Sequence, residues 1–190
     1  MSKNQGKLFV ITGPSGVGKG TLVRSLLSAH SQLFVSISAT TRQPRTGEVD
    51  GKDYYFLTTA QFESMIEEEN LLEWAQYAGN YYGTPKQAVL EQINQGKTVI
   101  LEIELLGARQ VKENFAQSQL IFILPPSEEE LERRLRGRGN DAEEAIKKRL
   151  ARAKEEIAAQ DEFDYKIVND QLESAIAQLE DIIFGKQEVN

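Results

Sequence analysis

The sequence contains no cysteine and a single histidine, His30, among its 190 residues. The lack of cysteine excludes disulfides and thiolate metal sites, and one histidine argues against a metal site with several histidine ligands or a histidine-based triad. No apolar run approaches the roughly 18 residues that a membrane-spanning helix needs. Residues 1–7 lack the apolar core of a signal peptide. These absences favour a cytoplasmic protein that contacts no membrane.

Positive charge is also in short supply. The chain has 22 lysines and arginines against 29 aspartates and glutamates, which gives a net charge of −7 and a pI near 5.0. A general nucleic-acid binder is usually basic, so this balance argues against one. Any polyanionic ligand must therefore meet local clusters of lysine and arginine. The length and the 40% content of hydrophobic residues suit one compact domain, residues 1–190.

Strand-like and helix-like segments alternate along most of the chain. The expected strands cover residues 8–12, 34–40, 98–104, 120–124 and 165–168. Helices are expected at residues 19–29 and 107–115, from Ser127, after Asp141 and at residues 171–184. Ser127 and Asp141 each stand three residues before a glutamate, as in a capping box. This alternation predicts an α/β fold with a five-stranded, mostly parallel sheet flanked by helices.

Two segments depart from this alternation. Residues 38–84 are rich in Tyr, Gly, Thr and charge, and we expect a small mixed α/β insertion that stands off the sheet. Residues 128–160 form a highly charged helical segment that is interrupted at Arg136-Gly137-Arg138-Gly139 and should be mobile and solvent-facing. The remaining residues, 1–37, 85–127 and 161–190, then form the core.

The segment Gly13-Pro14-Ser15-Gly16-Val17-Gly18-Lys19 follows an expected strand and opens an expected helix. Glycines in this context let backbone N–H groups converge on a phosphate, and the helix N-terminus and Lys19 add positive charge. The alternative is a glycine-rich turn. Gly20 stands where the general pattern has serine or threonine, and Thr21 follows one residue later. The hydroxyl group that usually contacts Mg²⁺ is therefore displaced.

The insertion contains the ingredients of a second anion site. Arg42 and Arg45 flank Pro44, and each arginine presents a planar set of donors that suits phosphate oxygens. Tyr54 and Tyr82 can each add a hydroxyl donor. A solvated basic turn with two packed tyrosines is the alternative for each residue alone, but beside a phosphate-binding loop the set favours a phosphate pocket.

The chain resembles the guanylate kinases over nearly its whole length. The resemblance rests on ordered segments that read GPSGVGKGTL, SISATTRQPRTGEVDGKDYYF, EWAQYAGNYYGTP, ILPPSEEELERRLRGRG and IVND. It implies a kinase of the phosphate-loop fold that transfers the terminal phosphoryl group of ATP to GMP, with Mg²⁺ as cofactor and ADP and GDP as products. The insertion 38–84 is then the GMP-binding subdomain, and residues 128–160 form a lid.

The resemblance also implies residue roles. The ATP site comprises the loop Gly13, Pro14, Ser15, Gly16, Val17, Gly18, Lys19, Gly20 and Thr21, with Asn169 near the adenine. The GMP phosphate matches Arg42, Arg45, Tyr54 and Tyr82, and guanine matches Ser38, Glu73 and Thr84. The residues expected to stabilise the transferring group are Lys19, Arg42, Arg134, Arg138 and Arg149. The simplest role for Asn169 and Asp170, from their position in a turn before a helix, is helix capping.

Three glutamates carry the remaining expectations. Guanine presents adjacent donors at N1 and N2, which a carboxylate such as Glu73 can accept and which adenine does not offer. Glu102 and Glu104 end an expected strand, where ligands meet parallel sheets. Family members commonly carry aspartate there. We expect Glu104 to contact guanine and Glu102, with Thr21, to contact the metal, in the case of Glu102 through water.

Two other functions remain open from the sequence. A guanylate-kinase-like scaffold module would bind phosphorylated partners in the same pocket without catalysis, but Gly13, Gly18 and Lys19 are intact here. A kinase for another nucleoside monophosphate would fit the variant at residues 18–21, but the residues matched to GMP argue against it. The sequence gives no oligomeric state.

Overall fold

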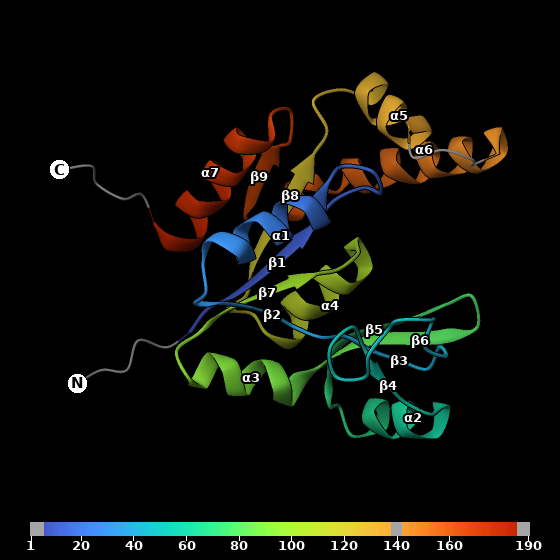
Figure 1. Ribbon diagram of the computed structural model, residues 1–190, viewed down its shortest axis with the longest axis vertical. Helices are drawn as coiled ribbons and strands as arrows, with labels where there is room; N and C mark the ends of the chain where they lie inside the picture. Colours follow the sequence, from blue (N-terminus) through green and yellow to red (C-terminus); the bar gives the residue numbers. More distant parts are fainter. Residues whose placement is uncertain (1–5, 138–141, 186–190) are drawn as a thin grey trace.

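The computed structural model describes residues 6–137 and 142–185. Its main sheet has five parallel strands in the order β2-β7-β1-β8-β9 (Figure 1). The strands are β1 (Leu8–Thr12), β2 (Leu33–Val35), β7 (Thr98–Glu102), β8 (Gln119–Leu124) and β9 (Tyr165–Val168). The predicted α/β fold with a five-stranded parallel sheet is confirmed.

Strand β1 lies at the centre of this sheet, and all five of its residues are buried. Phe9 and Ile11 face one hydrophobic core, while Leu8 and Val10 face the other. Helices α1 (Lys19–Ala29) and α7 (Leu172–Phe184) cover the first face, and α3 (Lys86–Asn94) and α4 (Leu105–Asn114) cover the second. Burial on both faces explains why the strand reads as a continuous apolar run.

A second, four-stranded sheet has the order β4-β3-β6-β5. Its elements are β3 (Ala39–Thr40), β4 (Tyr55–Phe56), β5 (Leu71–Tyr77) and β6 (Asn80–Pro85), with α2 (Thr59–Glu67) packed on it through Phe62. The single strand expected at residues 34–40 is wrong, because β2 and β3 from that segment belong to different sheets. The chain leaves the core sheet after Val35 and enters the second sheet at Ala39.

Helices α5 (Glu128–Gly137) and α6 (Glu143–Ala158) pack against each other beyond the core, followed by a short 3-10 helix at Gln160–Glu162. In Figure 1 this pair and the second sheet lie on either side of the carboxyl ends of the core strands. The solvent-facing character expected for this segment is only partly correct. Leu131 and Leu135 are 1% and 0% exposed and bury one stripe of α5 against Ala153 of α6.

The structure confirms one expectation about helix starts and corrects two others. The backbone N–H of Glu130 donates to the hydroxyl of Ser127 (3.1 Å), which confirms the serine cap of α5. Asp141 lies outside the described residues. The capping role expected for Asn169 is wrong, because α7 begins after Gln171 without a side-chain cap, and the Asn169 amide donates to the backbone oxygen of Val17 (2.8 Å). Strand β7 ends at Glu102, and α4 begins at Leu105, two residues before the expected start.

In the described part of the chain, no helix is both long and apolar enough to cross a membrane.

Candidate active site

A cavity of about 650 Å³ opens where the β1–α1 loop, the second sheet, the β7–α4 connection and α6 meet. Ten of the predicted site residues line it: Gly13, Ser15, Lys19, Ser38, Tyr54, Glu73, Tyr82, Glu102, Glu104 and Arg149. The other predicted residues that the structure describes lie outside this lining: Pro14, Gly16, Val17, Gly18, Gly20, Thr21, Arg42, Arg45, Thr84, Arg134 and Asn169. Arg138 lies outside the described residues.

The β1–α1 loop, residues 13–18, has glycine at two positions where its backbone lies too close to another segment for a side chain. Gly13 has a φ of 147°, and a Cβ there would lie 2.3 Å from the backbone oxygen of Ile123 on β8. Gly18 has a φ of 99°, and a Cβ there would lie 2.6 Å from the side-chain nitrogen of Asn169. The ammonium group of Lys19 contacts the backbone oxygens of Gly13 and Pro14. The loop therefore wraps around the Lys19 side chain at the start of α1.

Side chains from α5, α6 and β9 brace this loop. Arg134 on α5 donates to the backbone oxygen of Val17 (3.5 Å), and Arg149 on α6 donates to the hydroxyl of Ser15 (3.1 Å). Asn169 donates to the same backbone oxygen of Val17 from the end of β9. Two of the four arginines expected at the transferring group, Arg134 and Arg149, thus lie next to the loop.

Glu73 lies on the opposite wall of the cavity, on β5, with 7% of its surface exposed. Thr84, its antiparallel partner on β6, donates its hydroxyl to the carboxylate (2.6 Å). Burial raises the pKa of Glu73; the Thr84 hydrogen bond opposes this shift, and the negative charge of Glu104 adds to it. A Cβ at Gly107 would lie 2.7 Å from the Glu73 carboxylate, so any larger residue there would displace this carboxylate.

A β-bulge in β5 directs this carboxylate into the cavity. The pairing of β5 with β6 shifts between Leu71 and Glu73, and all three residues from Leu71 to Glu73 are buried. Leu71 packs in the small core of the second sheet, whereas Leu72 packs in the main core. The extra residue re-aims the strand at the cavity wall, which is a common use of a bulge.

The predicted phosphate arginines are organised by a residue that the sequence reasoning missed. The guanidinium of Arg42 makes two hydrogen bonds with the carboxylate of Glu48 (2.9 and 3.0 Å), which also accepts from the backbone N–H of Arg45 (2.7 Å). These contacts raise the pKa of Arg42 and lower that of Glu48. Arg42 also lies 5.4 Å from the ring centre of Tyr54, which lines the cavity. The acidic residue three positions after Arg45 was the available signal.

Two further charged residues of the cavity were also missed. Arg152 on α6 contacts the carboxylate of Glu104 and donates through Nε to Glu156 (2.9 Å). Burial raises the pKa of Glu156, while Arg152 and Lys19 counteract this shift. Arg152 and Glu156 lie three and seven residues after Arg149, which places all three on the same face of α6. This helical periodicity is the sequence feature from which they could have been predicted.

The residues predicted to contact the metal are less closely associated. A Cβ at Gly20 would lie 3.4 Å from the carboxylate of Glu102, which lines the cavity. Thr21 is exposed, and its hydroxyl accepts from Arg24 (3.3 Å). Within residues 6–137 and 142–185, no group of three or more histidine or carboxylate side chains is arranged to hold a metal ion.

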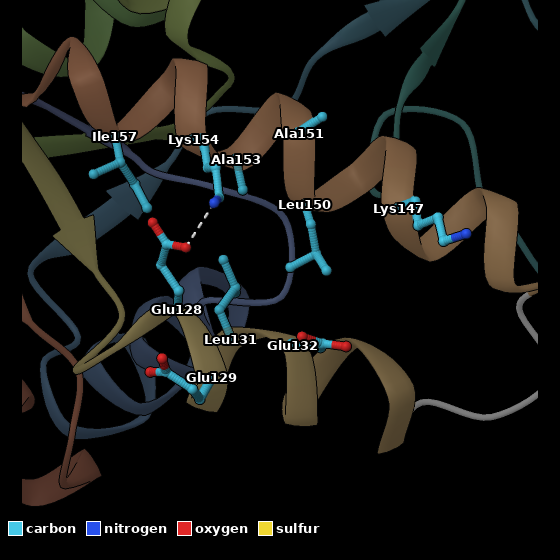
Figure 2. A pocket seen from close by; sticks show the side chains of 10 residues that line it. All are labelled: Glu128, Glu129, Leu131, Glu132, Lys147, Leu150, Ala151, Ala153, Lys154 and Ile157. Carbon is cyan, nitrogen blue, oxygen red and sulfur yellow. Dashed lines mark ion pairs between the residues drawn. The ribbon is translucent and has the colours of Figure 1, made fainter.

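A second cavity of about 390 Å³ lies between α5 and α6 (Figure 2). Leu131 and Leu150 point toward each other inside it, and Lys154 on α6 pairs with Glu128 on α5 (2.8 Å). Glu132 and Lys147, which also line it, pair with Arg136 and Glu144 outside the lining, and its apolar residues continue the packing between the two helices. The chemistry is concentrated in the larger cavity.

Comparison with known proteins identifies the family. The guanylate kinase family model matches residues 5–186. A guanylate kinase from Synechocystis sp. is 63% identical over 97% of this chain and 96% of its own length, and one from Nostoc sp. is 61% identical over 95% and 90%. The crystal structure of guanylate kinase from Anaplasma phagocytophilum superposes with a TM-score of 0.75 at 33% identity, covering 99% of this chain and 89% of the other. The shikimate kinase from Bacteroides thetaiotaomicron, at 16% identity and a TM-score of 0.53, shares the fold alone. This chain belongs to the guanylate kinase family.

Proposed function

We propose that this protein is an ATP-dependent guanylate kinase, which transfers the terminal phosphoryl group of ATP to GMP and releases ADP and GDP. One observation carries the proposal: a single cavity holds Lys19, at a glycine loop that opens a helix, and Glu73, a buried carboxylate. The first suits a nucleotide polyphosphate and the second suits the donor edge of guanine. Family membership supports the same reaction.

The donor pocket is the β1–α1 loop with its bracing residues. Backbone N–H groups of the loop and the start of α1 can surround the phosphates of ATP, and Lys19 can leave its backbone partners to neutralise them. We assign Arg134 and Arg149 to the transferring group because both already contact this loop. We also assign Asn169 to the adenine side of this pocket, and its contact with Val17 of the loop is the observation that supports this.

The acceptor pocket lies in the second sheet. Glu73 accepts from N1 and N2 of guanine, with Thr84 fixing the carboxylate and Ser38 on the same wall. The phosphate of GMP lies toward Tyr54 and Tyr82, near Arg42 and Arg45. Residues 38–84 act as the GMP-binding subdomain in this proposal, and residues 128–160 act as the lid.

Magnesium fits this site as a bridge between protein and substrate. Mg²⁺ typically binds through one or two carboxylates plus the phosphates and water. Glu102 lines this cavity, and its carboxylate lies 3.4 Å from where a Cβ at Gly20 in α1 would be, which suits such a contact through water. Thr21 is the weaker candidate because its hydroxyl faces Arg24. When bound, the ion would neutralise phosphate charge during transfer.

Catalysis then depends on positioning and charge neutralisation. The acceptor is a phosphate oxygen that is already largely ionised near neutral pH, since its second pKa is about 6, so no general base is needed. Lys19, Arg42, Arg134 and Arg149 offset the repulsion between two polyanions. Closure of the lid over the cavity would exclude water, which competes as an acceptor. The cytoplasmic location expected from composition belongs to this proposal.

A coupled assay with ATP and each of GMP, dGMP, AMP, CMP and UMP tests the proposal. We expect turnover with GMP to exceed turnover with AMP, CMP and UMP. Equal turnover with AMP would favour a kinase of another nucleoside monophosphate. An absence of turnover with every acceptor would favour the scaffold module.

A further inference from the structure

Arg152 lines the nucleotide cavity, but the phosphoryl transfer described above leaves it without a role. Its guanidinium contacts the carboxylate of Glu104, at the start of α4, and donates to Glu156 on its own helix (2.9 Å). The contact with Glu104 therefore joins α6, part of the proposed lid, to the wall of the core. Glu104 and Arg152 lie 48 positions apart in the sequence.

Glu104 faces the same space as the guanine-selecting carboxylate. Both Glu104 and Glu73 line the cavity, and the negative charge of Glu104 contributes to the environment of Glu73. Guanine presents three N–H donors on one edge, one at N1 and two at N2. The two oxygens of Glu73, one of which already accepts from Thr84, meet two of these donors in a bidentate contact. Of the other carboxylates that line the cavity, Glu104 is the one whose charge acts on Glu73, and it can accept from the third donor.

We propose that Arg152 is a positioning residue that competes with guanine for the carboxylate of Glu104. When GMP fills the acceptor pocket, Glu104 turns to the base, and α6 loses one of its contacts with the core wall. Occupancy of the acceptor pocket is thereby linked to the freedom of the lid. This inference rests on the proposed function, because it requires guanine to bind beside Glu73.

The expected effect is modest and has a diagnostic sign. The side chains of Arg152 and Glu104 are 53% and 75% exposed. A ligand that must break such an exposed ion pair binds about threefold more weakly than it would if the pair were absent. Removing Arg152 should therefore strengthen GMP binding about threefold. Simple electrostatics predicts the opposite, because losing a cation beside a phosphate ligand weakens binding.

The chain offers a matched control on the same helix. Lys154 is two residues from Arg152, but it points to the other side of α6, into the second cavity, where it pairs with Glu128 (Figure 2). Lys154→Gln removes the same charge as Arg152→Gln without touching the nucleotide cavity. A general effect of charge on GMP binding would appear in both variants.

Calorimetric titration of GMP into the wild type, Arg152→Gln, Lys154→Gln, Glu104→Gln and the double variant Glu104→Gln/Arg152→Gln tests the inference. We expect about threefold tighter binding for Arg152→Gln, unchanged binding for Lys154→Gln, and no further effect of Arg152→Gln once Glu104 is glutamine. Unchanged or weaker binding by Arg152→Gln, or an equal gain in the Glu104→Gln background, would overturn it. If the wild type turns over GMP, such a result leaves the proposed function intact; a wild type that neither binds nor phosphorylates GMP overturns both.

Discussion

The side-chain amide of Gln110 forms a reciprocal pair of hydrogen bonds with the backbone of Trp74. The backbone N–H of Trp74 donates to Oε1 of Gln110, and Nε2 of Gln110 donates to the backbone oxygen of Trp74, each over 3.0 Å. Gln110 belongs to α4 of the core, whereas Trp74 belongs to β5, the edge strand of the second sheet. Asn114, one turn later, donates to the backbone oxygen of Leu72 (2.8 Å). Helix α4 thus completes the hydrogen bonding of an edge strand on either side of Glu73.

Gln110→Ala should weaken GMP binding while leaving ATP binding nearly unchanged. The variant loses two hydrogen bonds that fix the residue next to Glu73, each of which contributes about 1 kcal/mol. We expect the KM for GMP to rise about fivefold to tenfold, measured by steady-state kinetics with the other substrate saturating. Glu113→Ala, at an exposed position of the same helix, is the matched control. Equal increases in both KM values would contradict a local role for Gln110.

Glu73→Gln should stabilise the free protein at high pH even though it damages the GMP site. The pKa of Glu73 is raised in the folded state, mainly by burial, so the folded state is penalised as the pH rises from the ordinary glutamate value through this raised pKa. At lower pH both the folded and unfolded states carry a neutral carboxyl group, and the penalty is absent. Glutamine can still accept from Thr84 and is never charged.

Thermal unfolding at pH 4 and pH 8 measures this difference. We expect the Tm of Glu73→Gln to exceed that of the wild type at pH 8 by more than at pH 4. Glu113→Gln, the same substitution at an exposed position of α4, is the matched control and should show no comparable pH trend. A Tm difference that is independent of pH would show that burial does not perturb Glu73.

Lys19→Ala should abolish transfer while GMP binding survives. Lys19 lies at the β1–α1 loop, and Glu73 lies on the opposite wall, so loss of the cation should lower kcat by about 10²-fold or more without altering the acceptor pocket. Lys97→Ala, at the start of β7 and therefore at the other end of the core sheet, is the control. Turnover and GMP affinity, measured separately, check this division. A GMP affinity that falls as far as kcat would contradict the two-pocket arrangement.

Much of the fold could be predicted because it depends on local patterns. The buried run at Leu8–Thr12 and the glycine loop after it determine β1, the loop and the start of α1 within a few residues of each other. The family and the α/β fold were confirmed for the same reason: they are written in contiguous motifs. The residue roles in the site and the division into core, insertion and lid stay predictions.

What escaped the sequence depends on contacts between distant segments. Gln110 and Arg152 act on residues 36 and 48 positions away, and each resembles an ordinary polar residue on a charged helix. The two leucines of α5 were overlooked for a similar reason, since they are the only apolar side chains in ten residues. Asn169 shows the converse, because a residue type that often caps helices instead donates a hydrogen bond to a loop residue 152 positions away.

The ratio of kcat/KM for GMP to kcat/KM for AMP, measured for the wild type and for Glu73→Gln, tests most directly whether this cavity selects guanine. A buried carboxylate that pairs with guanine can reject the wrong base by about 10⁴-fold to 10⁵-fold. We expect a large ratio for the wild type, and a ratio reduced by at least about 10²-fold for Glu73→Gln, chiefly through a weaker reaction with GMP. A wild-type ratio near one, or a large ratio that Glu73→Gln leaves unchanged, would contradict the assignment of Glu73 as the guanine-selecting residue.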